Sequence, residues 1–301
     1  MMLSIIVNIK NLEKLIVKCL DSLVFSLRNC DENKYEVILV DDNSTDGTED
    51  ILKEYDKNHH SFIYKKVYFN NLGKARKNII PLCKGKYITF IDGDDFLPSF
   101  DMQNIISILE KEKPDLFITK MHEVFHDMQL IATQNEIKYK IINKDNAIES
   151  FLLHKNFQAH LWGKFFSTKL MKSIEFPDVF CYEDAFFFPN YLNISNQILY
   201  SDNIIYNYVK HPASLSNDLN VEKIELMADV VLSMLDVLPK KHLNLNISHS
   251  IIHLYKYRKT LNHKTISKLT KKINEINFFS FILDPKVKFS IKKKYLIIKL
   301  K

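Results

Sequence analysis

The amino-acid sequence predicts an α/β fold with a mainly parallel central sheet flanked by helices. Apolar segments of strand character alternate with amphipathic segments of helical character through the first 120 residues. This alternation is typical of βα units, whose parallel sheet is covered on both faces. Acidic side chains follow two of the strands, at residues 41–42 and 92–95. Because open α/β sheets bind ligands at the carboxyl ends of their strands, these acids predict a ligand site there.

The bulk composition excludes several classes of protein. The chain has 301 residues, of which 46% are apolar and 26% charged, as in a soluble globular protein. No apolar run is long enough to span a membrane, and residues 1–7 resemble a first strand more than a signal peptide. The four cysteines lack the paired spacing of a metal site. Free thiols are typical of a reducing compartment, so we expect a cytoplasmic protein.

The first two βα units are expected within residues 4–55. Strands are predicted at residues 4–7 and 36–40 from their apolar, β-branched character. Apolar residues recur at intervals of three and four between 12 and 27, which predicts an amphipathic helix capped by Asn11. Asp46 and Glu49 have the spacing of a capping box, so a second helix is expected to follow them.

The next elements continue the alternation. Residues 62–69 are expected to form a third strand or a loop, and residues 73–82 a short basic helix. Residues 87–91 are predicted to be a buried strand, because they are rich in aromatic and β-branched side chains. Ser99 is expected to cap the following helix, and another short strand is expected at residues 115–119.

The pattern changes from about residue 140. Helices are predicted at residues 145–153, 221–238 and 249–269, and a strand at residues 204–209. Residues 162–166 form an aromatic-rich segment that contains the single tryptophan, Trp162. No G-x-G-x-x-G motif follows the first strand, which argues against a dinucleotide site, and no P-loop motif is present.

The acidic turn at residues 92–95 is a candidate metal site. Three carboxylates so close together repel one another unless solvent or a cation compensates them. A hard divalent ion, Mn²⁺ or Mg²⁺, relieves that repulsion and bridges to phosphate oxygens. The alternative is an acidic turn that caps the next helix.

The positive charge is concentrated at the end of the chain. Residues 256–301 contain 14 lysines and arginines and two acids, a net charge of +12, which leaves −6 for the preceding residues. A basic end on an acidic body indicates contact with an anionic surface, and we expect the inner face of the cytoplasmic membrane. Nucleic acid is less well supported, because no nucleic-acid-binding module accompanies the charge. A solvated basic helix or strand is the alternative.

Four motifs occur in order along the first 95 residues of the sequence. They are residues 4–7 (SIIV), 40–48 (VDDNSTDGT), 71–76 (NLGKAR) and 85–95 (GKYITFIDGDD). The sequence thereby resembles glycosyltransferase family 2, whose members have the GT-A fold. Residues 162–166 (WGKFF) and 183–187 (EDAFF) are similar to the acceptor-side pattern of bacterial members that build surface polysaccharide.

The resemblance implies roles for residues on the donor side. Asp41 or Asp42 would hydrogen-bond the uracil of a nucleotide sugar, and Arg76 would lie near the donor sugar or its phosphates. Asp92 and Asp94 would form the D-x-D motif. Asp94 would be the direct metal ligand, and Asp92 would contact the ribose or water molecules of the metal. The alternative for Asp41 and Asp42 is that they cap the turn that follows them.

The acceptor side carries further expectations. Asp184 would be the general base, with Glu183 beside it, and the neighbouring phenylalanines would desolvate Asp184 and raise its basicity. The alternative is an exposed helix start. Trp162 and Lys164 are candidate acceptor contacts, although core packing explains Trp162 equally well.

Two residues further along the chain are candidates for a phosphate contact. Lys210 or His211 would reach the diphosphate from a loop, or would be turn residues before Pro212.

The resemblance implies an inverting, metal-dependent enzyme. It would transfer a sugar, from a UDP-sugar in our expectation, to a saccharide or lipid-linked glycan in lipopolysaccharide, capsule or related polysaccharide synthesis. Residues 1–120 would bind the nucleotide sugar, residues 121–216 the acceptor, and residues 217–301 would form a basic helical region.

Residues 8–11 depart from the family pattern Pro-x-Tyr-Asn, and this supports a rival hypothesis, a non-catalytic partner that binds nucleotide sugar or glycan. A nucleotidyltransferase is a weaker rival, because those residues contain no glycine.

Overall fold

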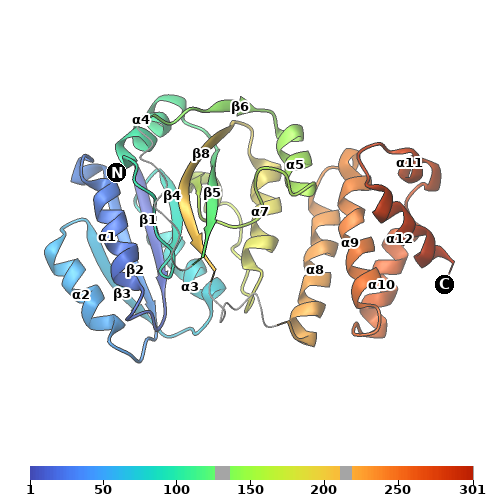
Figure 1. The fold of residues 1–301 in the computed structure, drawn as a ribbon, viewed down its shortest axis with the longest axis horizontal. Coiled ribbons are helices and arrows are strands. Elements are labelled where there is room, and N and C mark those ends of the chain that lie inside the picture. Colours follow the sequence, from blue (N-terminus) through green and yellow to red (C-terminus); the bar gives the residue numbers. More distant parts are fainter. Residues whose placement is uncertain (126–135, 211–218, 301) are drawn as a thin grey trace.

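The central feature of the fold is one mixed β-sheet (Figure 1). The computed structural model describes residues 1–125, 136–210 and 219–300, and their strands form an eight-stranded sheet in the order β3-β2-β1-β4-β7-β5-β8-β6. The strands are β1 (Leu3–Ile9), β2 (Tyr35–Asp42), β3 (Phe62–Val67), β4 (Tyr87–Asp92), β5 (Leu116–Val124), β6 (Lys140–Ile142), β7 (Lys164–Ser167) and β8 (Ile198–Val209).

The two halves of the sheet differ in strand direction. Strands β3, β2, β1 and β4 are parallel, as the alternation of strands and helices predicted. Strand β7 is antiparallel to both neighbours, β4 and β5, whereas β5 and β8 are parallel and β6 is antiparallel to β8. The prediction of an α/β fold with a flanked central sheet is therefore confirmed, and the antiparallel pairs are confined to its second half.

Helices cover both faces of the sheet and continue beyond it (Figure 1). The α-helices are α1 (Ile16–Leu27), α2 (Thr48–Asn58), α3 (Leu72–Ile79), α4 (Met102–Glu112), α5 (Lys144–Leu152), α6 (Thr168–Met171), α7 (Glu183–Ile194), α8 (Val221–Val237), α9 (Leu243–Tyr257), α10 (His263–Asn274), α11 (Phe278–Leu283) and α12 (Phe289–Lys299). Short 3₁₀ segments occur at η1 (Glu32–Lys34), η2 (Ile80–Leu82) and η4 (Lys240–His242).

The alternation of side chains along β1 separates two hydrophobic cores. Ile5 and Val7 belong to the core shared with α1, α2 and α4, whereas Ile6 belongs to the core shared with α3, α5 and α7. The second core extends without a break into α8–α12, which include Ile251 and Tyr295. The C-terminal helices are thus anchored to the sheet through α7, which contacts α8, and through α5, which contacts α9.

Three predicted helix starts are wrong, two of them because the side chain has another partner. Asn11 has a positive φ of 52° and accepts from the Thr45 backbone N–H, so α1 begins later, at Ile16. Asp101, not Ser99, caps α4 by accepting from the Gln103 N–H. In α2 the N-cap is Gly47, and Glu49 pairs with Lys53 and Lys66 instead of completing a capping box.

Later in the chain, some helices and strands have other bounds than predicted. The helix predicted at residues 249–269 is two helices, because α9 ends at Tyr257 and Asn262 caps α10. The aromatic-rich segment at residues 162–166 contains strand β7, and the predicted strand at residues 204–209 is the second half of β8. The basic end of the chain is helical, as expected, and within the described ranges no helix is both long and apolar enough to cross a membrane.

Gly85, just before β4, packs closely against the start of β1. Its N–H donates to Ser4 Oγ at 2.8 Å, and the Ser4 hydroxyl donates to the buried Glu36 carboxylate at 2.5 Å. A Cβ atom at Gly85 would lie 2.6 Å from the Leu3 carbonyl carbon. Because the obstructing atoms belong to a backbone held by two sheet partners, they cannot move away cheaply.

We therefore expect Gly85→Ala to lower the free energy of unfolding by about 1–3 kcal/mol, the usual cost of overpacking a core. Urea unfolding followed by circular dichroism measures this change. The exposed neighbour Lys84 supplies the control, since Lys84→Ala should change stability by less than about 0.5 kcal/mol. Equal stability of Gly85→Ala and the wild type would contradict the close approach.

Candidate active site

The acidic turn after β4 is anchored to β8 through Asp95. Its carboxylate accepts from the Tyr206 hydroxyl at 2.6 Å and from the Val209 N–H at 2.7 Å, and Tyr206 also accepts from the Asp92 N–H at 3.1 Å. Burial, followed by the charges of Asp92 and Asp94, raises the pKa of Asp95 to about 8. Asp92 and Asp94 are partly exposed. The turn therefore holds its third carboxylate inside and presents the D-x-D pair at the end of the strand.

Arg76 joins this turn to the acceptor-side acids. Its guanidinium is 3% exposed and contacts Glu183 at 2.5 Å and Asp92 at 2.9 Å. It lies 5.2 Å from the centre of the Phe90 ring. The buried Arg76 Nε has no hydrogen-bond partner among the described residues. The structure thus brings Arg76, Asp92 and Glu183 together, and one donor of the guanidinium is available for a further acceptor.

Glu183 and Asp184 begin α7 but are not an exposed helix start. Glu183 is 6% exposed, and burial raises its pKa to about 7 despite the nearby Arg76 charge. Burial would also raise the pKa of Asp184, but contact with His160 at 3.6 Å and the charge of Arg76 outweigh it and lower that pKa. Desolvation acts on Asp184 in the expected direction, but the expected net rise in its basicity is wrong, because His160 and Arg76 outweigh the burial. Asp184 is ionised at neutral pH, the state in which a carboxylate accepts a proton.

A stack of aromatic rings connects Asp184 to the acidic turn. The rings of His160 and Trp162 lie 4.4 Å apart at 7°, and those of Trp162 and Tyr206 lie 4.8 Å apart at 4°. Tyr208 stacks on the same indole at 5.5 Å. Trp162 is 7% exposed, so core packing accounts for most of its surface. Its predicted acceptor contact stays a prediction.

Asp41 and Asp42 both carry local structural bonds. Asp42 accepts from the backbone N–H groups of residues 69, 70 and 71 at 2.7–2.8 Å and so fixes the loop between β3 and α3. Asp41 is fully buried and accepts from the Ser44 N–H and the Tyr64 hydroxyl. Both acids lie at the carboxyl end of β2, as expected. Their predicted contact with uracil stays a prediction.

Asn8, in the segment that departs from the family pattern, is part of this site. It lies opposite Asp92 in the pairing of β1 with β4, so both side chains point to the same face of the sheet. The Asn8 side chain is buried, and neither its Nδ2 nor its Oδ1 has a partner among the described residues. Buried amides that lack partners are rare, which indicates that a ligand or water completes this site. Lys10, where the family has an aromatic residue, donates to Asn70 Oδ1 at 2.7 Å.

The remaining candidates lie at the edge of the site or outside the described residues. Lys210 pairs with Glu123 at 2.5 Å and follows the end of β8. His211 lies outside the described residues, so its predicted phosphate contact is not tested. A role of Lys210 toward the diphosphate stays a prediction.

The acidic turn after β4 suits a metal ion whose coordination shell is completed by a bound phosphate ligand and water. In the ranges that the structure covers, no three histidine, cysteine, aspartate or glutamate side chains are grouped to hold a metal by themselves. Mg²⁺, however, is usually held by one or two carboxylates, with phosphate oxygens and water as the other ligands. The partly exposed Asp92 and Asp94 fit that requirement, and Asp94 stays the candidate direct ligand.

Three residues of the site were not predicted from the sequence. They are His160, which contacts Asp184, Tyr206, which supports Asp95, and Asn8. The position of His160, two residues before Trp162, was the one local signal. Tyr206 could not be found from the sequence, because 111 positions separate it from its partner Asp95.

Lys164, a candidate acceptor contact, is instead held inside the protein. It is 3% exposed, its Nζ donates to the His160 carbonyl, and it lies 5.1 Å from the centre of the Phe188 ring. Burial lowers the pKa of Lys164 to about 7, while the Asp184 charge opposes that change. Lys164 therefore supports the loop that carries His160, and contact with an acceptor stays a prediction.

The lowered pKa of Lys164 predicts how the free energy of unfolding depends on pH. Between pH 7 and pH 9 Lys164 is protonated in the unfolded chain and largely neutral in the folded chain, so its contribution to stability rises with pH. We expect wild-type protein to gain about 2 kcal/mol relative to Lys164→Met over this range. Urea unfolding at both pH values tests this, with the exposed Lys169→Met as control. A difference that is independent of pH would show that Lys164 stays charged.

Comparison with characterised proteins places this arrangement in a family. A family model described as Glycosyl transferase family 2 matches residues 4–185. The poly(ribitol-phosphate) beta-glucosyltransferase of Bacillus spizizenii is 34% identical over 40% of this chain and 19% of its own length. Glycosyltransferase GlyA of Streptococcus pneumoniae is 23% identical over 76% of this chain and 35% of its own length. The putative glycosyltransferase EpsH of Bacillus subtilis is 27% identical over 70% and 62%. The chain thus spans only part of each relative's length.

Solved structures share the fold. Residues 1–349 of S. aureus TarS in complex with UDP superpose with a TM-score of 0.72 at 20% identity, over 100% of this chain and 87% of that chain. The mannosyltransferase PcManGT from Pyrobaculum calidifontis in complex with GDP-Man and Mn²⁺ superposes with a TM-score of 0.56 at 13% identity, over 99% and 85%. The predicted GT-A fold is confirmed by these neighbours. Since the family model covers more than half of the chain and includes the acidic motifs through Asp184, the chain belongs to glycosyl transferase family 2.

Proposed function

We propose that the chain is an inverting, metal-dependent glycosyltransferase that moves a sugar from a UDP-sugar to a glycan acceptor in the synthesis of a bacterial surface polymer. Lipopolysaccharide, capsule and related polysaccharides are the expected products. The observation that carries this proposal is the Arg76 bridge, which joins the D-x-D turn to the Glu183–Asp184 pair inside the region that matches the family. A UDP donor is supported by the complexes of S. aureus TarS with UDP and UDP-GlcNAc.

The donor would lie across the carboxyl ends of β1, β2 and β4. Asp41 or Asp42 would accept from the uracil N–H, and Asp92 would contact the ribose. The unpartnered Arg76 Nε would donate to the diphosphate or the sugar. Bound to Asp94 and to the diphosphate, Mn²⁺ or Mg²⁺ would offset the charge that develops on the leaving group.

Asp184 would act at the acceptor. It is ionised, and on α7 it directly follows Glu183, the partner of Arg76. It would take the proton of the acceptor hydroxyl while that oxygen bonds to the anomeric carbon and the bond to the diphosphate breaks. Attack opposite the leaving group inverts the configuration, so an α-linked donor gives a β-linked product. The beta-transferases among the relatives support this outcome.

The donor half of the proposal is tested by calorimetric titration with UDP, GDP and CMP, with and without Mn²⁺. We expect UDP to bind most tightly, Mn²⁺ to tighten binding at least tenfold, and Asp94→Asn to remove the effect of Mn²⁺ because it removes a metal-ligand charge. Asp101→Asn, at the N-cap of α4, is the control and should bind UDP like the wild type. No metal-linked binding of any nucleotide would favour the non-catalytic partner.

The acceptor half is tested by the pH dependence of turnover. Asp184→Asn should lower kcat at least about 100-fold, the usual contribution of a general base. His160→Gln removes the contact that lowers the pKa of Asp184, so the acidic limb of the kcat/KM profile should move to higher pH by about one unit. His154→Gln, in the same loop, should leave the profile unchanged. Near wild-type turnover of a folded Asp184→Asn variant would exclude the assigned base.

The basic C-terminal region is proposed to contact an anionic membrane surface. Helices α11 and α12 expose Phe279, Leu283 and Phe289, and the adjoining Lys292 and Lys293 add positive charge. Each lysine near such a surface contributes about 1 kcal/mol, and exposed apolar side chains enter the interface.

We expect the protein to sediment with phosphatidylglycerol vesicles and not with phosphatidylcholine vesicles. Raising the salt concentration from 0.1 to 0.5 M should release it, because the Debye length shortens. Phe289→Ser should reduce the bound fraction, and Phe25→Ser, on the opposite end of the molecule in α1, should not. Equal binding to both kinds of vesicle, or to neither, would contradict a membrane contact.

A further inference from the structure

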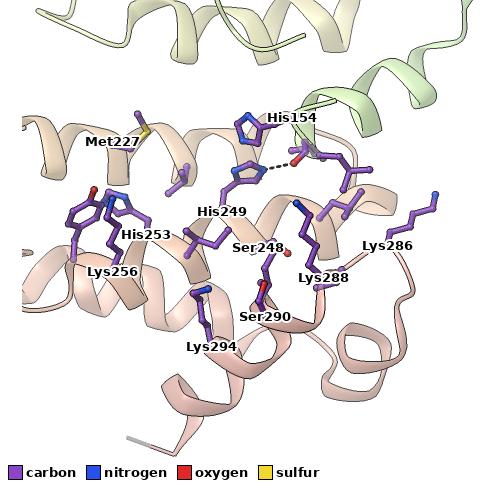
Figure 2. A pocket seen from close by; sticks show the side chains of 18 residues that line it. His154, Met227, Ser248, His249, His253, Lys256, Lys286, Lys288, Ser290 and Lys294 are labelled. Atoms are coloured by element: carbon purple, nitrogen blue, oxygen red, sulfur yellow. Dashed lines mark hydrogen bonds between the residues drawn. The ribbon is translucent and has the colours of Figure 1, made fainter. Parts of the chain in front are cut away.

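A pocket lies among the C-terminal helices (Figure 2). It has a volume of about 530 Å³ and is bounded by the end of α5, by α8 and α9, and by the segment that leads into α12. Its walls include the apolar side chains of Leu152, Met227, Val231, Leu245 and Ile291. None of the described residues that line it belongs to the candidate active site.

Lysine side chains give this pocket its charge. Lys256, Lys286, Lys288 and Lys294 all line it, whereas its described lining contains no aspartate or glutamate. Lys286 pairs with Glu149 at 2.5 Å. For the other three, no ion pair is found in the part of the chain that the structure covers. Lys256 and Lys294 lie 4.8 and 5.6 Å from the centres of the Tyr257 and Tyr255 rings. Positive charge that no described carboxylate of the lining offsets would attract an anion to the pocket.

The histidines of the pocket do not supply this charge. His249 Nε2 lies 2.9 Å from the Leu152 carbonyl oxygen, and the His154 ring lies 5.2 Å from the His249 ring. Burial, with His154 beside it, lowers the pKa of His249 to about 4. Burial and then the Lys288 charge lower the pKa of His154. Figure 2 shows the exposed Lys288 side chain extending toward these two rings, so its ammonium group lies at the mouth of the pocket.

We propose that this pocket binds a phosphate ester that carries an apolar chain. Lys288 and Lys294 would hold the phosphate, and the chain would lie against the aliphatic wall formed by Val231 and Ile291. A phosphate alone would leave that wall uncovered, and a neutral chain alone would leave the lysines uncompensated. The volume lies within the range of small-molecule sites, about 300–1,000 Å³. The site is independent of the donor site, because it shares no described residue with it.

The test is calorimetric titration with dodecyl phosphate below its critical micelle concentration. Inorganic phosphate and dodecyl maltoside are the comparisons, because they present the anion alone and the chain alone. We expect dodecyl phosphate to bind at least tenfold more tightly than either. Equal binding of inorganic phosphate would overturn the proposal in favour of a simple anion site, and equal binding of dodecyl maltoside would overturn it in favour of a simple apolar site.

Matched variants locate the binding. The double substitution of Lys288→Gln and Lys294→Gln should weaken dodecyl phosphate at least tenfold. The double substitution of Lys292→Gln and Lys293→Gln makes the same charge change on α12 outside the pocket and should weaken it less than twofold. Ile252→Trp, which fills the rim of the pocket, should also weaken binding. Equal effects of the two double substitutions would overturn the proposal.

Competition separates the two sources of such an ester. If phosphatidylglycerol vesicles displace dodecyl phosphate, the ligand is a membrane lipid. If they do not, it is a freely diffusing ester, and in both cases the pocket is supported. Because no nucleotide is present, a failure here is distinguishable from a failure of the proposed glycosyl transfer.

Discussion

The buried Arg76 guanidinium is the interaction on which the site depends. It is nearly inaccessible to solvent, yet it contacts carboxylates on both β4 and α7. A charge buried this deeply is tolerated only with such partners, because a buried cation with no carboxylate beside it would be uncompensated. Arg76 therefore fixes the distance between the end of the sheet, where the D-x-D turn lies, and the helix that carries Asp184. The pKa of about 7 for Glu183 fits this arrangement, since burial and the cation act on it in opposite directions.

A second set of contacts runs alongside the first. From Asp95 it passes through the Tyr206 hydroxyl to the stacked rings of Trp162 and His160, and so to Asp184. Stacked rings and a buried hydrogen bond have few alternative arrangements, so this route is rigid. The acidic turn and the proposed base are thus positioned twice, once by an ion pair and once by packing. The same residues explain why Trp162 is buried although it belongs to an acceptor-side motif.

The C-terminal helices are part of this design because they share a core with α7. One hydrophobic cluster extends from Phe90 in the sheet through Phe187 and Phe188 to Ile251 and Tyr295. The C-terminal helices therefore support α7, which carries Glu183 and Asp184, through this shared core. They also form the lysine-lined pocket, and α11 and α12 expose apolar side chains next to it. The lysines at the end of the chain thus belong to two distinct structural features, the exposed surface of α11 and α12 and the lysine-lined pocket.

The sequence by itself determined the parallel half of the sheet, the position of the acids at the ends of β2 and β4, and the family. These depend on local periodicity and on motifs of a few residues, which are visible without a structure.

The tertiary structure alone decided the partners of those acids. Arg76 and Glu183 are 107 positions apart and Asp95 and Tyr206 are 111 apart, so no local pattern relates them. The same cause explains the wrong helix starts, because Asn11 and Glu49 are drawn to partners on other elements. It also explains Lys164, a polar motif residue in sequence whose burial and low pKa follow only from the helix and loop packed around it.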